Sequence, residues 1–163
     1  MITEKDRKYL KRCIELAREA LEKGNAPFGS ILVSQNGEVL FEDHNRTSGG
    51  DNTQHPEFAI ARWAANNMQE TDRLHATVYT SGEHCSMCAS AHALAGLGRI
   101  VYASSTRQLK EWQEEMDAAP GRLKGLSIQE VVNDIEVDGP DEFLSEEVKE
   151  LQFAYLESQK ESR

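Results

Sequence analysis

The chain has 163 residues, a net charge of −10 and 39% hydrophobic residues, which is typical of a soluble globular protein, and we expect a single domain over residues 1–163. No apolar run approaches the roughly 20 residues of a membrane span, and the charged first residues predict no secretory signal. The acidic excess argues against a large nucleic-acid-binding surface, because such surfaces neutralise phosphates with Lys and Arg.

The first elements predicted are a helix and a hairpin. Thr3 is a suitable helix N-cap, and apolar residues then recur at helical spacing until Gly24, where a helix would end. Residues 29–43 have the pattern of two strands around Asn36 and Gly37, a dipeptide typical of tight hairpin turns. The chain therefore begins with a helix followed by an antiparallel pair of strands.

Helices and strands alternate through the rest of the chain. Residues 44–54 have the composition of a loop, and Pro56 is typical of the first position of a helix. Ser145 is the predicted N-cap of the last helix. The predicted elements are helices over 55–67, 85–96, 106–116 and 145–158, and strands over 75–81, 99–104 and 135–137.

This order of elements predicts the fold class. A hairpin followed by alternating strands and helices favours a mixed sheet covered by helices on both faces. We therefore expect an α/β protein with three α/β/α layers and about five strands. Residues 117–145 carry the weakest pattern of the chain, and only a short strand near 135–137 is predicted there.

Two cysteines at a predicted helix start indicate a metal site. Cys85 and Cys88 are three residues apart, so both sulfurs lie on one face of a helix, whose N-terminus favours thiolates. His55 stands at another helix start, which a mixed sheet can place beside the first. Three protein ligands and one open position are typical of catalytic zinc. The alternatives are chance packing of two reduced cysteines, or a structural zinc site with a fourth ligand from His44, His75, His84 or His92.

Glu57 follows His55 by two residues and is the candidate proton carrier. A carboxylate beside the open position of a metal can take a proton from water and return it to a leaving group. The alternative is an ordinary first-turn glutamate that interacts favourably with the helix dipole. The nearby metal ligands favour the catalytic interpretation.

These residues carry a resemblance to a known family. The segment "HPE", followed thirty residues later by "CSMC", resembles the H-x-E…P-C-x-x-C motif of zinc-dependent cytidine deaminase-like enzymes. The similarity runs from "GNAPFGSILV" to "RIVYAS" and is greatest to the branch of guanine deaminases, fungal cytosine deaminases and tRNA adenosine deaminases. It implies the cytidine deaminase-like fold and a zinc cofactor.

The resemblance also implies residue roles. His55, Cys85 and Cys88 would bind zinc, and Glu57 would be the catalytic proton shuttle. Asn45 would contact the substrate base, and Phe28 would line the pocket beside it. The alternatives are a loop Asn in a turn and a buried core Phe.

Three positions depart from the family pattern. His84 stands where the family usually has proline. It would place a titratable group at the rim of the site, but we expect a substitution without consequence. His92 replaces an expected apolar residue, and it faces either the pocket or a subunit interface. Leu94 stands where guanine deaminase-like chains tend to carry an aromatic residue, which predicts a reshaped pocket.

We expect a hydrolytic deaminase of a small aminated nucleobase or nucleoside, with guanine or a related aminopurine first and cytosine second. A tRNA adenosine deaminase is the first alternative, although residues 145–163 are acid-leaning rather than basic. A non-catalytic zinc-binding interaction module is the second. The odd cysteine count favours a reducing cytoplasm over a disulfide framework, and family resemblance predicts a homodimer or larger homo-oligomer.

Overall fold

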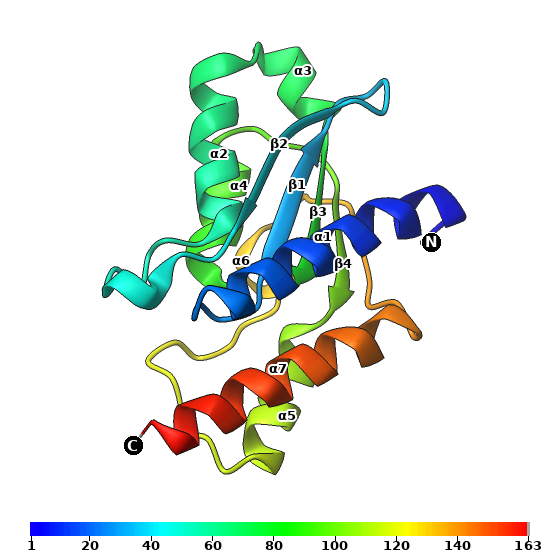
Figure 1. The fold of residues 1–163 in the computed structure, drawn as a ribbon. Coiled ribbons are helices and arrows are strands. Elements are labelled where there is room, and N and C mark those ends of the chain that lie inside the picture. Colours follow the sequence, from blue (N-terminus) through cyan, green and yellow to red (C-terminus); the bar gives the residue numbers. More distant parts are fainter. Residues whose placement is uncertain (163) are drawn as a thin grey trace.

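A computed structural model describes residues 1–162 as a sheet between two layers of helices (Figure 1). The strand order is β2-β1-β3-β4-β5. Strand β1 pairs antiparallel with β2 and β3, whereas β3, β4 and β5 are parallel. The predicted mixed sheet of about five strands in a three-layer α/β/α fold is confirmed. The strands are β1 (Gly29–Val33), β2 (Val39–His44), β3 (Thr77–Gly82), β4 (Ile100–Ser104) and β5 (Val137–Asp138).

The β1–β2 hairpin turns at the predicted dipeptide of Asn36 and Gly37. Gly37 has φ +85°, a left-handed conformation that glycine adopts without a steric cost. The amide of Ser34 donates to the carbonyl of Glu38 at 2.8 Å and closes the turn. The Tyr9 hydroxyl donates to the Gly37 carbonyl at 2.7 Å, which ties the turn to the first helix.

One face of the sheet is covered by α1 and α7, the blue and red helices of Figure 1, and α5 packs against α7. Thr3 caps α1 as predicted, because its hydroxyl accepts from the Asp6 amide at 3.1 Å and the Asp6 carboxylate accepts from the Thr3 amide at 2.9 Å. Within residues 1–162, no helix is long and apolar enough to cross a membrane. These helices are α1 (Glu4–Glu22), α5 (Thr106–Glu115) and α7 (Leu144–Glu161).

The opposite face is covered by the remaining helices. Ile31 and Leu32 are consecutive in β1 and belong to different core clusters, because successive strand side chains point to opposite faces. Strand β1 is buried on both faces for this reason. The helices of this layer are α2 (Pro56–Asn67), α3 (Glu70–Leu74), α4 (Ser86–Leu94) and α6 (Ile128–Val131).

Strand directions bring three helix starts to one edge of the sheet. Because β1 is antiparallel to both neighbours, β2 runs in the same direction as β3 and β4. The connections that follow β2, β3 and β4 therefore emerge at the same edge, where α2, α4 and α5 begin. Ligand sites of open α/β sheets lie at the carboxyl ends of such strands.

The start of α7 differs from the prediction. Ser145 was the predicted N-cap, but the helix begins at Leu144 and Ser145 lies inside its first turn. Asp141 takes the capping role, because its Oδ1 accepts from the amides of Phe143 and Leu144 at 3.1 and 2.9 Å. A carboxylate upstream of the helix therefore satisfies amides that Ser145 does not reach.

Three short elements were not predicted. They are the helices α3 and α6 and the 3₁₀ turn Thr47–Gly49, each of five residues or fewer. Segments of this length are too short to show helical periodicity in a sequence. The strand predicted at 135–137 is shifted and shortened to Val137–Asp138.

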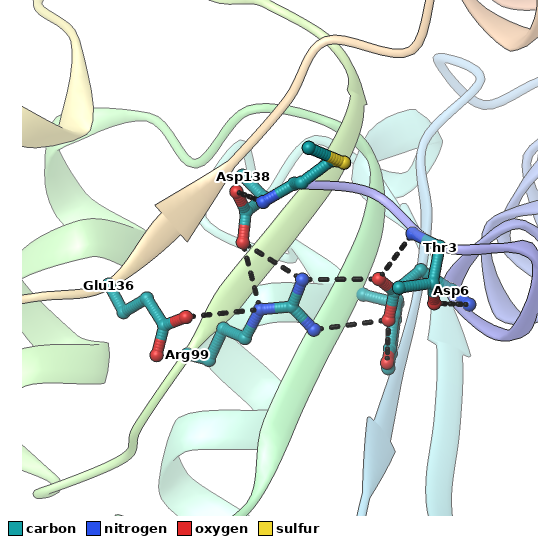
Figure 2. A network of polar contacts seen from close by, with 7 residues as sticks. Thr3, Asp6, Arg99, Glu136 and Asp138 are labelled. Carbon is teal, nitrogen blue, oxygen red and sulfur yellow. Dashed lines mark hydrogen bonds and ion pairs between the residues drawn. The ribbon is translucent and has the colours of Figure 1, made fainter.

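Arg99 joins three distant segments through an ion-pair network (Figure 2). Its guanidinium donates to both carboxylate oxygens of Asp6 at 3.0 and 3.1 Å and to Asp138 at 2.8 and 3.0 Å. The Tyr79 hydroxyl donates to Asp6 at 2.7 Å, and the amino group of Met1 lies 2.6 Å from Asp138. The network connects α1, the start of β4 and the short strand β5.

Asp6 is buried, and burial alone would raise its pKa. Hydrogen bonds from Arg99, Thr3 and Tyr79 outweigh burial and hold the pKa of Asp6 well below its usual range. A depressed folded-state pKa stabilises the fold above the unfolded-state pKa of about 3.9, and this stabilisation is lost as pH falls below that value.

We predict that Asp6→Asn lowers the free energy of unfolding at pH 7 by about 3 kcal/mol, because it leaves a largely buried guanidinium without one partner. Glu111→Gln is the matched control, since Glu111 pairs with Arg107 on the surface and its loss should cost less than about 1 kcal/mol. Urea unfolding at pH 7 and at pH 3 measures both. The deficit of Asp6→Asn should shrink at pH 3, and a deficit independent of pH would contradict the assignment.

Candidate active site

A pocket of about 560 Å³ opens at the edge where β2, β3 and β4 end. Its inner part is formed by five of the predicted site residues and by three residues that were not predicted, Pro56, Glu83 and Ser86. These inner residues are Phe28, Asn45, His55, Pro56, Glu57, Glu83, Cys85 and Ser86. Residues 106–126 form the outer part.

The structure brings the three predicted metal ligands together. His55 is the N-cap of α2 and Cys85 is the N-cap of α4, so the adjacent helix starts supply both. His55 Nδ1 lies 3.6 Å from each of the sulfurs of Cys85 and Cys88. Ligands held by one tetrahedral zinc at about 2.05 Å for nitrogen and about 2.3 Å for sulfur lie about 3.6 Å apart. The donor set and its spacing therefore fit zinc.

The cysteine pair is prepared for a cation. A hydrogen bond from the Cys88 thiol, with a further contribution from His55, lowers the pKa of Cys85 despite its burial. The same pairing raises the pKa of Cys88 in the chain alone. A divalent cation favours both thiolates, since metal binding displaces the shared proton.

No fourth ligand joins this group within residues 1–162. His44 Nδ1 donates to the Asn45 carbonyl at 2.8 Å, and His75 Nδ1 donates to the Thr71 carbonyl at 2.9 Å. Three protein ligands without a fourth are typical of a catalytic zinc site rather than a structural one.

Glu57 is buried beneath the pocket and is held at one oxygen. The hydroxyls of Ser30 and Thr80 lie 2.7 and 2.9 Å from Glu57 Oε1. Burial raises the pKa of Glu57, and the hydrogen bond from Ser30 and the charge of His55 oppose this effect. Neither hydroxyl contacts Oε2, so this oxygen is available to move a proton.

Ser30 and Thr80 were not predicted as site residues. They are cross-strand partners in β1 and β3 and lie 2.8 Å apart beneath Glu57. The signal in the sequence is weak: a small hydroxyl side chain interrupts each of two apolar strand runs. Only the pairing of the two strands places both hydroxyls under one carboxylate.

Asn45 lines the pocket with a defined orientation. Its Oδ1 accepts from the amide and the hydroxyl of Thr47 at 3.0 and 2.7 Å. An amide oxygen has two lone pairs, and both are used here. The Asn45 side chain therefore has only its amide N–H groups left for a ligand.

Phe28 lies over Gly82, at the end of β3. A Cβ atom at position 82 would come within 3.1 Å of the Phe28 ring, so a larger residue there would displace the ring. Glycine at this position therefore allows the aromatic face to approach the metal ligands. Phe28 lines the pocket as predicted.

None of the three departures from the family pattern lines the pocket, and the alternative position of His92 at a subunit interface stays a prediction. His84 is 1% exposed and His92 is 1% exposed, and neither lines the pocket or its rim. Their rings stack edge to face with centroids 5.4 Å apart, and His92 Nε2 lies 2.7 Å from the Gly98 carbonyl. Burial lowers the pKa of both histidines. Leu94 is 89% exposed on the far side of α4, so the predicted reshaping of the pocket by His92 and Leu94 was wrong.

Comparison with known proteins identifies relatives of this chain. Residues 3–104 match a family model described as the cytidine and deoxycytidylate deaminase zinc-binding region. A probable cytosine deaminase of Schizosaccharomyces pombe is 32% identical over 141 residues, which cover 85% of this chain and 86% of the relative. A tRNA-specific adenosine deaminase of Haemophilus influenzae is 33% identical over 104 residues, covering 63% of this chain and 60% of that protein.

Solved structures share the fold. A guanine deaminase from Nitrosomonas europaea has a TM-score of 0.69 at 18% identity, covering 96% of this chain and 86% of its own. A guanine deaminase from Bacillus subtilis has a TM-score of 0.57 at 27% identity, covering 71% and 78%. The matched zinc-binding region holds the three candidate metal ligands, and it spans well over half of the chain. This protein therefore belongs to the cytidine and deoxycytidylate deaminase family and is a hydrolytic deaminase.

Proposed function

We propose that the protein hydrolyses the exocyclic amino group of a small nucleobase or nucleoside and releases ammonia. The observation that carries this proposal is that Glu57 lines the same pocket as His55 and Cys85, which form one group of metal ligands with the buried Cys88. The order of the proposed substrates differs from the order that the sequence predicts. Cytosine now precedes guanine, because the probable cytosine deaminase is 32% identical over 85% of this chain, whereas the guanine deaminase that covers 96% of the chain is 18% identical.

Zinc, when held by His55, Cys85 and Cys88, supplies a Lewis acid that makes water a better nucleophile. Glu57 Oε2 takes a proton from the attacking water and passes it to the ring nitrogen. A bond from the water oxygen to the ring carbon forms. Glu57 next takes the remaining proton from the hydroxyl group now bonded to the ring carbon and passes it to the amino group. The carbon–nitrogen bond breaks as the carbonyl forms, and ammonia leaves. Ser30 and Thr80 hold Oε1 still, so that Oε2 remains within reach of both partners.

Two further side chains orient the ring. The Asn45 amide donates to an acceptor on the ring edge, since its oxygen is already bonded to Thr47. The Phe28 ring offers an aromatic surface against which a flat base can pack. Both pyrimidines and purines present such an acceptor, so these contacts support deamination of either class.

Deamination of adenosine in tRNA is the second candidate, favoured by the 33% identity to the Haemophilus influenzae enzyme. The net charge of −10 disfavours it, because tight tRNA binding needs several cations on one face. The acid-leaning helix α7 supplies no such face. We therefore rank the small-molecule substrate first.

We also propose a homodimer or larger assembly in the cytoplasm. Leu74 and Leu94 are 61% and 89% exposed, and apolar side chains of this size are commonly covered in oligomers. The three cysteines are free thiols, which a reducing compartment maintains.

We predict one zinc per chain in the purified protein, and its loss in Cys85→Ala and in Cys88→Ala, because two remaining ligands hold the ion weakly. Cys13→Ala is the control, since Cys13 is buried in the core under α1 and should keep full zinc. Elemental analysis of dialysed protein measures all four samples. Full zinc retention in both site variants would place the metal elsewhere.

We predict that Glu57→Gln keeps zinc and fold but lowers kcat by at least about 10²–10⁴, the range of general acid–base catalysis. Glu38→Gln, in the exposed hairpin turn, is the matched control and should match the unmodified enzyme. Ammonia release and zinc content are measured on the same preparations. Activity retained in Glu57→Gln would refute the proposed proton carrier, and zinc loss would recast Glu57 as a ligand.

We predict ammonia release from cytosine at the highest kcat/KM in a panel of cytosine, cytidine, guanine, guanosine, adenine and adenosine. Asn45→Ala should lower kcat/KM by about tenfold to a hundredfold, the expected cost of one buried hydrogen bond to the ring. A tRNA transcript is assayed for inosine in parallel. Turnover of tRNA with an inert panel would establish the second candidate instead.

A further inference from the structure

The outer wall of the pocket is formed by one segment, residues 106–126. Fourteen of the twenty-two residues that line the pocket belong to this outer wall, so it decides which ring substituents fit. Only its first ten residues are helical, in α5, and residues 117–125 are mostly exposed without regular structure. Such a segment has little packing of its own and needs attachment at its ends.

Glu83 is attached to both ends of the outer wall. Its Oε1 accepts from the amide of Thr106 at 2.9 Å, and its Oε2 accepts from the amide of Ile128 at 2.8 Å. Thr106 begins α5, and Ile128 begins α6 just beyond the wall. One carboxylate therefore closes a loop of more than twenty residues at its base.

The amides of Thr106 and Ile128 are not satisfied by the capping residues of their own helices. Ser105 and Ser127 each form a capping box with the residue three positions on, which satisfies the amides of Gln108 and Glu130. The first amide of each helix has no partner within its own helix. Glu83 supplies the missing acceptor to both.

Glu83 also lies next to the metal ligands. It precedes Cys85 by two residues, and its own amide donates to the Ser104 carbonyl at 2.8 Å, which holds it at the end of the sheet. The short connection between β3 and α4 therefore carries a metal ligand and the attachment of the outer wall. Through Glu83, this connection fixes the position of the outer wall relative to the metal ligands.

We propose that Glu83 is a positioning residue that holds the outer wall over the pocket and so sets the affinity for the substrate. The consequence for affinity rests on the proposed function, whereas the attachment of the wall does not. Two donors that face two oxygens need a carboxylate. Glutamine would present an NH₂ group to one of the amide N–H donors, and one end of the wall would be released.

Hydrogen exchange and kinetics on the zinc-loaded protein test this proposal together. In Glu83→Gln, amides within 106–128 should exchange about tenfold faster or more, the effect expected from losing a hydrogen bond to a charged group. Exchange in α1 should stay unchanged. With cytosine as the substrate, KM should rise about tenfold while kcat stays within about threefold and zinc stays at one per chain.

Thr106→Pro provides a second variant that leaves the segment before Cys85 intact. Proline is tolerated at the first helical position, and Ser105 already has the extended conformation that precedes proline, with φ −91° and ψ 160°. This change removes the amide N–H from which Glu83 Oε1 accepts, together with the Thr106 side chain, and it leaves the contact of Glu83 with Ile128. It should reproduce the faster exchange at the α5 end of the wall.

Ser127→Ala is the matched control, because it removes a cap of α6 and leaves both contacts of Glu83. Faster exchange should then be confined to 127–131, with KM unchanged.

Wild-type exchange over 106–128 in Glu83→Gln would overturn the proposal, whether or not cytosine is turned over. A loss of zinc and kcat at unchanged KM would also overturn it and assign Glu83 to the metal site. If the unmodified enzyme released ammonia from none of the six substrates, the proposed function would be contradicted. The hydrogen-exchange result alone would then decide whether Glu83 holds the outer wall.

Discussion

Strand β1 runs antiparallel to both of its neighbours, and the site depends on this arrangement. It makes β2, β3 and β4 point toward one edge of the sheet, so that the helices after them begin side by side. His55 and Cys85 are thirty residues apart in the chain, yet both are N-caps at this edge. Strand β1 is buried on both faces. Ile31 packs into the core that includes α1 and α7, and Leu32 packs into the core that includes α2, so both cores fix the position of the strand.

Burial and hydrogen bonding are balanced around Glu57. A carboxylate removed from water favours its neutral form, and hydrogen bonds favour the charged form. Ser30 and Thr80 contribute these bonds at one oxygen without neutralising the group. The result is a carboxylate with one oxygen held by two hydroxyls and a second oxygen that neither hydroxyl contacts, which suits a group that must accept and return a proton.

The pocket has two parts with different physical origins. The inner part stands on strand ends and helix starts, whose geometry the sheet imposes. The outer wall is mostly irregular and exposed, and its attachment to the sheet runs through Glu83. The metal ligands and the outer wall therefore stand on different supports, because the wall meets the sheet through Glu83 rather than through the helix starts that carry His55 and Cys85.

The sequence by itself determined the longer helices and strands, the mixed sheet and the candidate metal ligands, because periodicity, the hairpin turn and the spacing of Cys85 and Cys88 are local signals. Only the tertiary structure decided which polar groups meet. It placed Ser30 and Thr80 under Glu57, turned the Asn45 oxygen toward Thr47 and buried His84 away from the rim. These contacts join side chains from different strands and loops, and spacing along a chain carries no information about such partners.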